Sequence, residues 1–132
     1  MDLIRQITLF ENITHTNVKE SFMFKDKLTF MVGPGEMGKA LGKKKVNLEK
    51  LEKLLNKQIR IIEFSEDLLT FIGNLIAPLK IVRISENENI VTIVGPDTKT
   101  KGLMIGSKAK NLRETEEVVK KHFPNLKEIK II

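Results

Sequence analysis

Residues 37–48 read Met-Gly-Lys-Ala-Leu-Gly-Lys-Lys-Lys-Val-Asn-Leu, and residues 101–112 read Lys-Gly-Leu-Met-Ile-Gly-Ser-Lys-Ala-Lys-Asn-Leu. The two stretches share glycine, asparagine and leucine at one fixed spacing of 64 residues, close to half the chain. The shared pairs are Gly38 and Gly102, Gly42 and Gly106, Asn47 and Asn111, and Leu48 and Leu112. Such a repeat indicates two copies of one small fold rather than one fold with a single active site.

The positive charge of the chain gathers on these two stretches. The net charge is +6, and residues 38–57 contain seven lysines against two glutamates. Residues 98–113 contain four lysines and one arginine and no acidic residue. Cations that cluster on both copies of a repeat favour contacts with phosphate over an evenly solvated surface.

Length and composition are those of a globular protein. The chain has 132 residues, of which 41% are hydrophobic and 30% charged, within the usual range of soluble domains. No apolar run approaches the ~20 residues of a membrane helix, and the first residues do not resemble a signal peptide. The absence of cysteine excludes disulfides and thiolate metal sites. We therefore expect a cytoplasmic protein without membrane contact.

The first copy reads as helix, strand, strand, helix, turn, helix, strand. Apolar spacing predicts a helix over 2–13 with Leu3, Ile4, Ile7 and Phe10 on one face. Strands are expected at 18–24, 27–32 and 58–63, the first two joined by a turn at 25–26. Between the strands at 27–32 and 58–63 we expect a short helix over 36–41 and a longer helix, whose buried stripe is Leu48, Leu51, Leu54 and Leu55.

The second copy repeats this order from residue 65. Ser65 is a candidate N-cap for a helix that Pro78 ends. Strands are expected at 79–84 and 90–94 with a turn over 86–89, then helices near 99–105 and 109–122 and a last strand at 129–131. Leu112, Val118 and Val119 are expected to be buried. The pattern therefore predicts an α+β protein with one domain over 1–64 and another over 65–132.

Enzymatic readings of the sequence lack the residues they need. Residues 33–40, Gly-Pro-Gly-Glu-Met-Gly-Lys-Ala, match the spacing of a nucleotide-binding P-loop, but Ala40 stands where magnesium needs Ser or Thr. His15 and His122 have no metal-ligand spacing. Glu116 and Glu117 are adjacent on a helix and indicate a solvated face rather than a catalytic pair. We expect no enzyme, no catalytic residue, no metal and no cofactor.

The repeated glycine turn has a physical use. A helix that begins after a turn presents unpaired backbone N–H groups and a positive dipole end, which favour anions. Gly42 and Gly106 lack a Cβ, so a sugar–phosphate backbone can approach closely. A helix-turn-helix of DNA repressors is a rival, but strands flank each helix pair here. The chain has no Trp or Tyr, which disfavours readers that stack bases on aromatic rings.

The two glycine turns, the order of the elements and the joint between the copies resemble a known family. A helix, a turn of the type Ile/Leu-Gly-x-x and a helix, within the order helix-strand-strand-helix-helix-strand, look like a type II KH domain. Two in tandem resemble the paired KH domains of NusA-type transcription factors, and the short archaeal NusA-like proteins most of all. The most specific segment is the joint, Ile61-Ile62-Glu63-Phe64-Ser65-Glu66-Asp67, followed by Phe71, Asn74, Ala77-Pro78 and Lys80-Ile81-Val82.

This resemblance implies two tandem type II KH domains, each with a three-stranded mixed sheet packed by helices. It also implies binding of single-stranded RNA and a role in transcription termination or antitermination alongside RNA polymerase. Together with the charge pattern, it assigns RNA binding to Gly38, Lys39, Gly42, Lys43, Lys44, Lys45 and Asn47, and to Lys101, Gly102, Gly106, Ser107, Lys108, Ala109, Lys110 and Asn111.

The turn departs from the family pattern in both copies. The family motif is Gly-x-x-Gly, but its last position is Lys45 in the first copy and Ala109 in the second. A Cβ at this position conflicts with a close RNA backbone or with a positive φ. Neither departure introduces an acid, so the electrostatic part of the interface is kept. The open question is whether Lys45 and Ala109 still admit the phosphate backbone.

Three alternatives stay open. Asn47 and Asn111 either contact RNA or hydrogen-bond the local turn. The degenerate turns also fit a protein-interaction module that docks on polymerase and has little RNA affinity. A duplex-DNA binder is the third reading. The sequence indicates neither the oligomeric state nor the preferred RNA.

Overall fold

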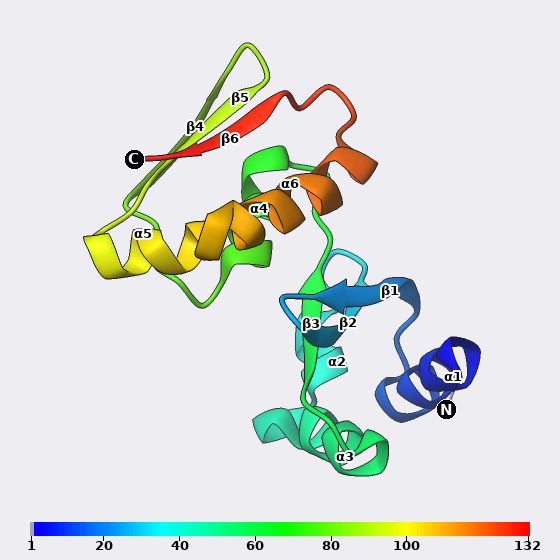
Figure 1. Ribbon diagram of the computed structural model, residues 1–132. Coiled ribbons are helices and arrows are strands. Elements are labelled where there is room, and N and C mark those ends of the chain that lie inside the picture. Colours follow the sequence, from blue (N-terminus) through cyan, green and yellow to red (C-terminus); the bar gives the residue numbers. More distant parts are fainter. Residues whose placement is uncertain (1) are drawn as a thin grey trace. The chain divides into compact units, whose positions relative to one another are not determined.

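The computed structural model describes residues 2–132, and its contacts divide the chain into two compact units (Figure 1). The first unit ends at Ser65 and the second begins at Glu66. The first unit contains α1 Leu3–Thr14, β1 Val18–Phe24, β2 Lys27–Val32, α2 Met37–Leu41, the 3₁₀ turn η1 Lys43–Lys45, α3 Val46–Leu55 and β3 Ile59–Glu63. The second contains α4 Leu68–Ile76, β4 Arg83–Asn87, β5 Ile90–Val94, α5 Thr98–Ile105, η2 Ser107–Ala109, α6 Lys110–His122 and β6 Glu128–Ile131.

Each unit has one three-stranded mixed sheet. The order is β1-β2-β3 in the first unit and β4-β5-β6 in the second, with an antiparallel hairpin and a parallel third strand in each. The third strand is parallel because the chain crosses over through two helices before it returns, as parallel pairs require. The α+β fold class, predicted as two tandem type II KH domains, is confirmed.

Buried phenylalanines contribute to both cores. In the first unit Phe10 of α1 stacks on Phe30 of β2, with ring centroids 4.4 Å apart. In the second unit the ring of Phe71 in α4 lies 5.9 Å from Phe123 and 5.7 Å from His122. His122, the last residue of α6, therefore packs against the ring of Phe71 in α4. Aromatic pairs of this kind add to the stability from buried area.

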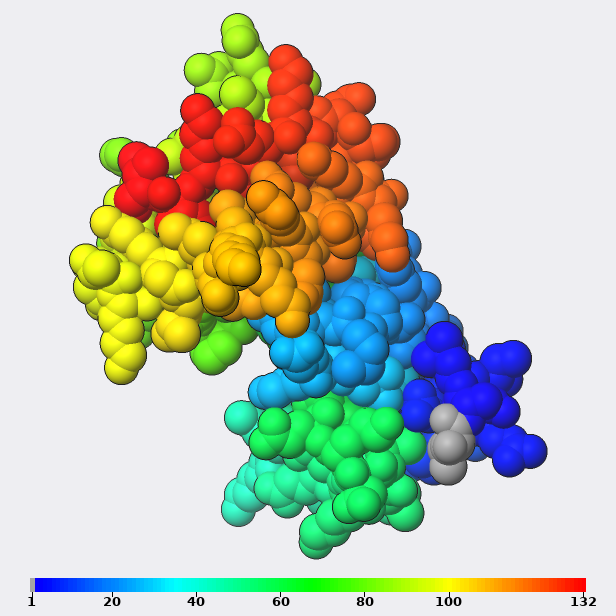
Figure 2. Space-filling model, in the orientation of Figure 1, coloured from blue at the N-terminus to red at the C-terminus, as the bar shows by residue number. Residues whose placement is uncertain are grey.

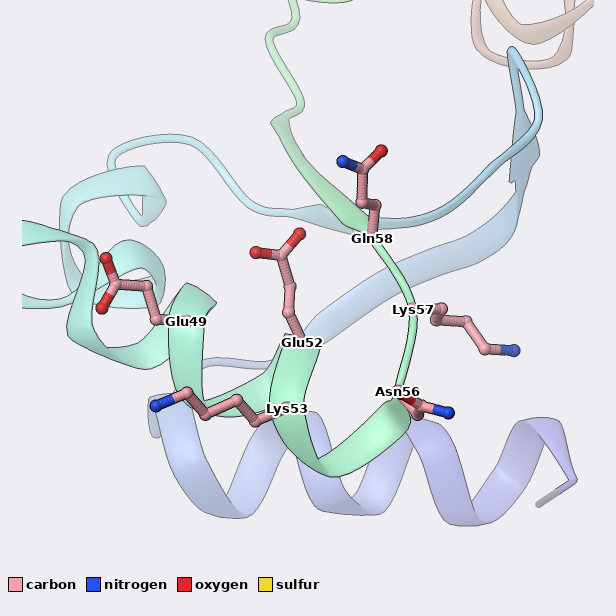
Figure 3. A pocket seen from close by; sticks show the side chains of 6 residues that line it. All are labelled: Glu49, Glu52, Lys53, Asn56, Lys57 and Gln58. Carbon is pink, nitrogen blue, oxygen red and sulfur yellow. The ribbon is translucent and has the colours of Figure 1, made fainter.

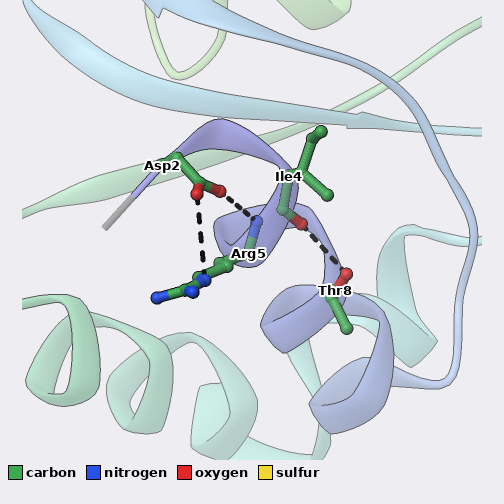
Figure 4. Close-up of polar contacts among 4 residues, drawn as sticks. All are labelled: Asp2, Ile4, Arg5 and Thr8. Carbon is green, nitrogen blue, oxygen red and sulfur yellow. Dashed lines mark hydrogen bonds and ion pairs between the residues drawn. The ribbon is translucent and has the colours of Figure 1, made fainter.

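Several helical predictions need correction at single residues. Leu54 is 53% exposed, because the inner face of α3 follows Leu51 and Leu55, four residues apart. In α1, Ile4 is 77% exposed and lies outside the inner face. That helix is capped by Asp2, whose carboxylate accepts a hydrogen bond from the Arg5 amide at 2.9 Å (Figure 4). One turn further, the hydroxyl of Thr8 donates to the carbonyl of Ile4 at 2.9 Å (Figure 4).

The start of α4 also differs from the prediction. Asp67, not Ser65, is the N-cap, and its carboxylate accepts hydrogen bonds from the hydroxyl of Thr70 at 2.6 Å and from the amide at 3.0 Å. These two bonds, the hydroxyl bond first, hold the pKa of Asp67 below its usual value. The cap and its bonds place the first residue of the helix at Leu68.

The strand predicted over 79–84 is wrong, since β4 is Arg83–Asn87. Pairing with β5 sets its register, from Arg83 opposite Val94 to Asn87 opposite Ile90. The ladder therefore extends into residues of low intrinsic strand preference. The turn is reduced to Glu88-Asn89, with φ of 51° and 67°. A two-residue turn with both φ values positive matches the twist of a hairpin.

Candidate nucleic-acid interface

The two glycine turns have nearly the same backbone. Gly42 has φ 77° and ψ 170°, and Gly106 has φ 77° and ψ 173°. The third position of each turn, Lys44 or Lys108, has φ 54° and ψ 32° or φ 53° and ψ 33°. Each turn is closed by an amide of the fourth position that donates to the glycine carbonyl, at 3.0 Å in the first unit and 3.2 Å in the second. The repeat in sequence is thus a repeat in backbone geometry.

The side chains of Asn47 and Asn111 determine why the turn begins with glycine. A Cβ built on Gly42 would lie 2.8 Å from Cγ of Asn47, and one on Gly106 would lie 2.7 Å from Cγ of Asn111. A positive φ combined with an extended ψ is also a region that essentially only glycine occupies. Both the backbone conformation and the asparagine therefore require glycine at these two positions.

Each asparagine bonds the helix before its turn. Nδ2 of Asn47 donates to the carbonyl of Lys39 at 3.2 Å, and Nδ2 of Asn111 donates to the carbonyl of Leu103 at 3.0 Å. Of the two readings of these residues, the local hydrogen bond is present in both units. The amide connects the start of α3 to α2 and the start of α6 to α5, so each turn is held from both sides. An RNA contact by either asparagine stays a prediction.

The fourth position of each turn adopts a positive φ without glycine. Lys45 has φ 61° and ψ 27°, and Ala109 has φ 61° and ψ 23°. A side chain at this position is therefore compatible with the turn, at a cost of about 1 kcal/mol for left-handed backbone. Lys45 follows Lys44, so two successive lysines hold this conformation in the first unit. Both units therefore share one turn geometry although the last glycine of the motif is absent from each.

The predicted site residues lie in the turns and in the helices beside them, and most of the lysines among them are exposed. Lys39, Lys43, Lys44, Lys45, Lys108 and Lys110 are exposed, as are Gly38, Gly102 and Ser107, while Gly42, Gly106, Ala109 and the two asparagines are partly buried. Lys101 is the predicted site lysine that is partly buried. It lies one turn from the start of α5, near Asp97, with its aliphatic stem over Gly95. The yellow segment that carries α5 is at the surface (Figure 2).

Gly38 and Gly102 occupy helical positions where glycine has no packing function. A Cβ built on either residue would meet no atom within 4 Å. Glycine in the middle of a helix costs roughly 0.5–1 kcal/mol relative to alanine, which applies to Gly102 within α5, whereas Gly38 is the second residue of α2. Both units thus keep a less stable residue, one turn before the glycine turn, and leave the helix backbone bare at the surface.

Sequence reasoning missed a second pair of equivalent residues. Glu52 accepts a hydrogen bond from the Ile59 amide at 3.0 Å, and Glu116 accepts one from the Ile129 amide at 2.8 Å. Each carboxylate satisfies a backbone donor in the last strand of its unit. The prediction of a solvated face is wrong for Glu116 and holds for the exposed Glu117. The spacing of 64 residues between Glu52 and Glu116 was the available signal.

A surface depression at the end of α3 offers no comparable chemistry. Its lining mixes both charges and is formed by Glu49, Glu52, Lys53, Asn56, Lys57 and Gln58 (Figure 3). The acidic side chains offset the two lysines, so the site carries no net positive charge for a phosphate.

Among residues 2–132, no helix is long and apolar enough to cross a membrane.

Comparison with known proteins gives this repeat a family. No family model matches the chain. The chain is 31% identical to the "Probable transcription termination protein NusA" of Methanococcus vannielii, over 98% of this chain and 76% of that protein. The protein of the same name from Thermoplasma acidophilum is 29% identical, over 92% and 87%. The crystal structure of APE1850 is 28% identical, covers 98% of this chain with 96% of its own, and has a TM-score of 0.68.

These relatives span nearly the whole chain, including both glycine turns. The likeness in sequence and the likeness in structure agree with the resemblance that the joint and the turns imply. The chain belongs to the archaeal NusA family, whose curated relatives carry the name of transcription termination proteins.

Proposed function

We propose that the protein binds single-stranded RNA through its two glycine turns and acts in transcription termination or antitermination, in the cytoplasm and together with RNA polymerase. The observation that carries the proposal is the pair of turns with matching φ and ψ and exposed lysines around each. Family membership supports the role in termination, because the curated relatives are named for it. The protein contributes binding and positioning, and no catalytic step.

The chemistry of the interface fits a phosphate backbone. The first N–H groups of α3 and α6 are bonded within the turns, since the Val46 amide donates to the Lys43 carbonyl and the Lys110 amide donates to the Ser107 carbonyl. The attraction for phosphate therefore comes from the lysines. Lysines supply the charge, and no acidic residue lies within either turn. A backbone held in this way needs no particular base, so the turns provide sequence-independent affinity. The bare helix surface at Gly38 and Gly102 leaves room for a ribose or a base beside them.

A titration at several salt concentrations tests the proposal. If roughly 4–6 phosphates are neutralised, the logarithm of affinity for single-stranded RNA falls against the logarithm of salt with a slope of about −3 to −4, using ~0.7 per contact. Labelled single-stranded RNA, single-stranded DNA and duplex DNA are compared by fluorescence anisotropy. Duplex DNA bound as tightly as single strands, or a slope near zero, would contradict it.

A matched pair of variants locates the contact. Lys43→Gln with Lys44→Gln removes two charges from the first turn and is expected to reduce the slope by about 1.4. Lys50→Gln with Lys53→Gln removes the same charge from exposed positions of α3 and is expected to leave the slope unchanged. Equal effects of the two pairs would mean that the turn is not the contact.

One observation favours a second candidate, a module that docks on a protein partner. Both turns lack the last family glycine, at Lys45 and Ala109. Binding to purified RNA polymerase in the absence of measurable RNA affinity would favour this reading over the first.

A further inference from the structure

The two turns share their backbone but differ in the side chains around it. Corresponding φ and ψ angles in the two units agree within a few degrees. Differences in what the units bind therefore come from side chains. Two positions are exchanged: the residue three before the turn glycine is Lys39 in the first unit and Leu103 in the second, and the residue four after it is Val46 in the first and Lys110 in the second.

All four exchanged residues are exposed, with Val46 at 54% and Leu103 at 51%. The asparagine bonds relate each pair to its turn. Asn111 follows Lys110 directly and its amide bonds the carbonyl of Leu103 at 3.0 Å, so Leu103 and Lys110 stand on the two sides of one turn. Asn47 relates Lys39 and Val46 in the same way. The exchange thus alters the chemistry of each side of the interface.

The surroundings of the two apolar residues differ. Val46 comes directly after three consecutive lysines. We therefore expect an RNA strand in contact with Val46 to be held mainly through its phosphates. Leu103 follows Gly102, a bare helical position where a Cβ would meet nothing within 4 Å. The turn after Leu103 carries Ser107 and Ala109 and only one lysine. Leu103 therefore offers an exposed apolar side chain next to a helical position without a side chain, where the face of a base could pack.

We propose that the second unit discriminates between RNA bases through Leu103, while the first unit supplies most of the salt-dependent affinity. The inference rests on the proposed RNA binding and assigns the two units different parts of it. Among the predicted site residues the first unit has four lysines, Lys39, Lys43, Lys44 and Lys45, and the second has three, Lys101, Lys108 and Lys110. At ~0.7 per contact, the first unit contributes about four thirds of the salt slope of the second.

The test measures affinity for oligo-A, oligo-C and oligo-U of equal length at several salt concentrations. Leu103→Asn removes the apolar contact without adding charge. It is expected to lower the ratio between the tightest and weakest oligonucleotide by about fourfold to fifteenfold, the value of one or two buried methyl groups, with an unchanged slope. Leu103→Met keeps the apolar contact and is expected to keep the ratio. Lys39→Gln is expected to reduce the slope by about 0.7 and to leave the ratio unchanged.

The outcomes separate this inference from the function on which it rests. An unchanged ratio in Leu103→Asn, or an equal fall in Lys39→Gln, overturns the role of Leu103. Wild-type protein that binds RNA without preference among the three oligonucleotides overturns the inference and leaves RNA binding intact. Wild-type protein without RNA affinity at any salt concentration overturns both. Because Leu103 is half exposed, its replacement is expected to leave the protein folded. Thermal melting of each variant checks this.

Discussion

The fourth position of the first turn gives a sharp prediction, that Lys45→Gly stabilises the protein. Lys45 has φ 61° and is exposed, so its replacement relieves left-handed backbone and loses no packing. The relief is about 1 kcal/mol, and the greater freedom of glycine in the unfolded chain offsets up to about half of it. The expected gain is ~0.5–1 kcal/mol. For a unit of this size that raises Tm by about 2–8 °C.

The control is Lys50→Gly, on the exposed face of α3. It removes the same charge, but places glycine in a helix interior, where it costs up to about 1 kcal/mol. The two variants are therefore expected to shift Tm in opposite directions. Thermal and urea unfolding followed by circular dichroism measure both. The reasoning about the left-handed turn is refuted if Lys45→Gly melts at or below the wild-type temperature.

Ala109→Gly makes the same change in the second unit without altering charge, and it decides the question that the sequence left open. Ala109 has φ 61°, so a similar gain in Tm is expected. If its Cβ obstructs the phosphate backbone, the variant binds RNA more tightly at every salt concentration. If affinity is unchanged, the backbone already passes the turn with Ala109 in place.

Two further predictions concern the helices around the turns. Gly102→Ala, in the interior of α5, is expected to raise stability by roughly 0.5–1 kcal/mol and to weaken RNA binding. Gly38→Ala, at the second residue of α2, is expected to weaken RNA binding with a smaller gain in stability. Gly73→Ala, at a helical glycine of α4 with equally open space, is expected to raise stability alone. Weaker binding in all three variants would remove the argument for a bare surface. Asp97 caps α5 and its pKa is lowered, first by the hydrogen bond from the Thr100 amide and then by the Thr100 hydroxyl. Its carboxylate thus stabilises the fold above the unfolded pKa of about 3.9, and this stability is lost as pH falls through the lower folded value. Asp97→Ala should lower Tm at neutral pH, and the gap to the wild type should close below about pH 4; a gap that persists in acid would contradict the role of the charge.

Much of the fold follows from local pattern. The first hairpin was predicted at its observed bounds, because alternation over 27–32 and the Lys25-Asp26 turn are local signals. The second hairpin was predicted too early in the chain. Its first strand, β4, contains little apolar pattern, and its position depends on the partner strand β5. Pairing between strands overrides the weak preference of single residues.

The candidate site divides in the same way. The glycine, lysine and asparagine positions follow from the spacing of 64 residues. The function of each asparagine does not, because its bond partner lies eight residues away in another helix. The exposure of Leu103 and Leu54 also does not follow from the sequence, since helical spacing indicates a face only approximately and the packing of the neighbouring elements decides which residues the core covers.

By itself the sequence determined that the chain is a repeat, the order of its elements, the basic character of both turns and the family. These depend on residue types and spacing, which are local properties of the chain. Only the tertiary structure decided why glycine begins each turn, how Lys45 and Ala109 adopt left-handed backbone, and which apolar side chains face solvent. These depend on the three-dimensional positions of side chains and backbone groups, which residue types and spacing do not specify. An example is the asparagine amide that bonds a carbonyl eight residues earlier, in the preceding helix.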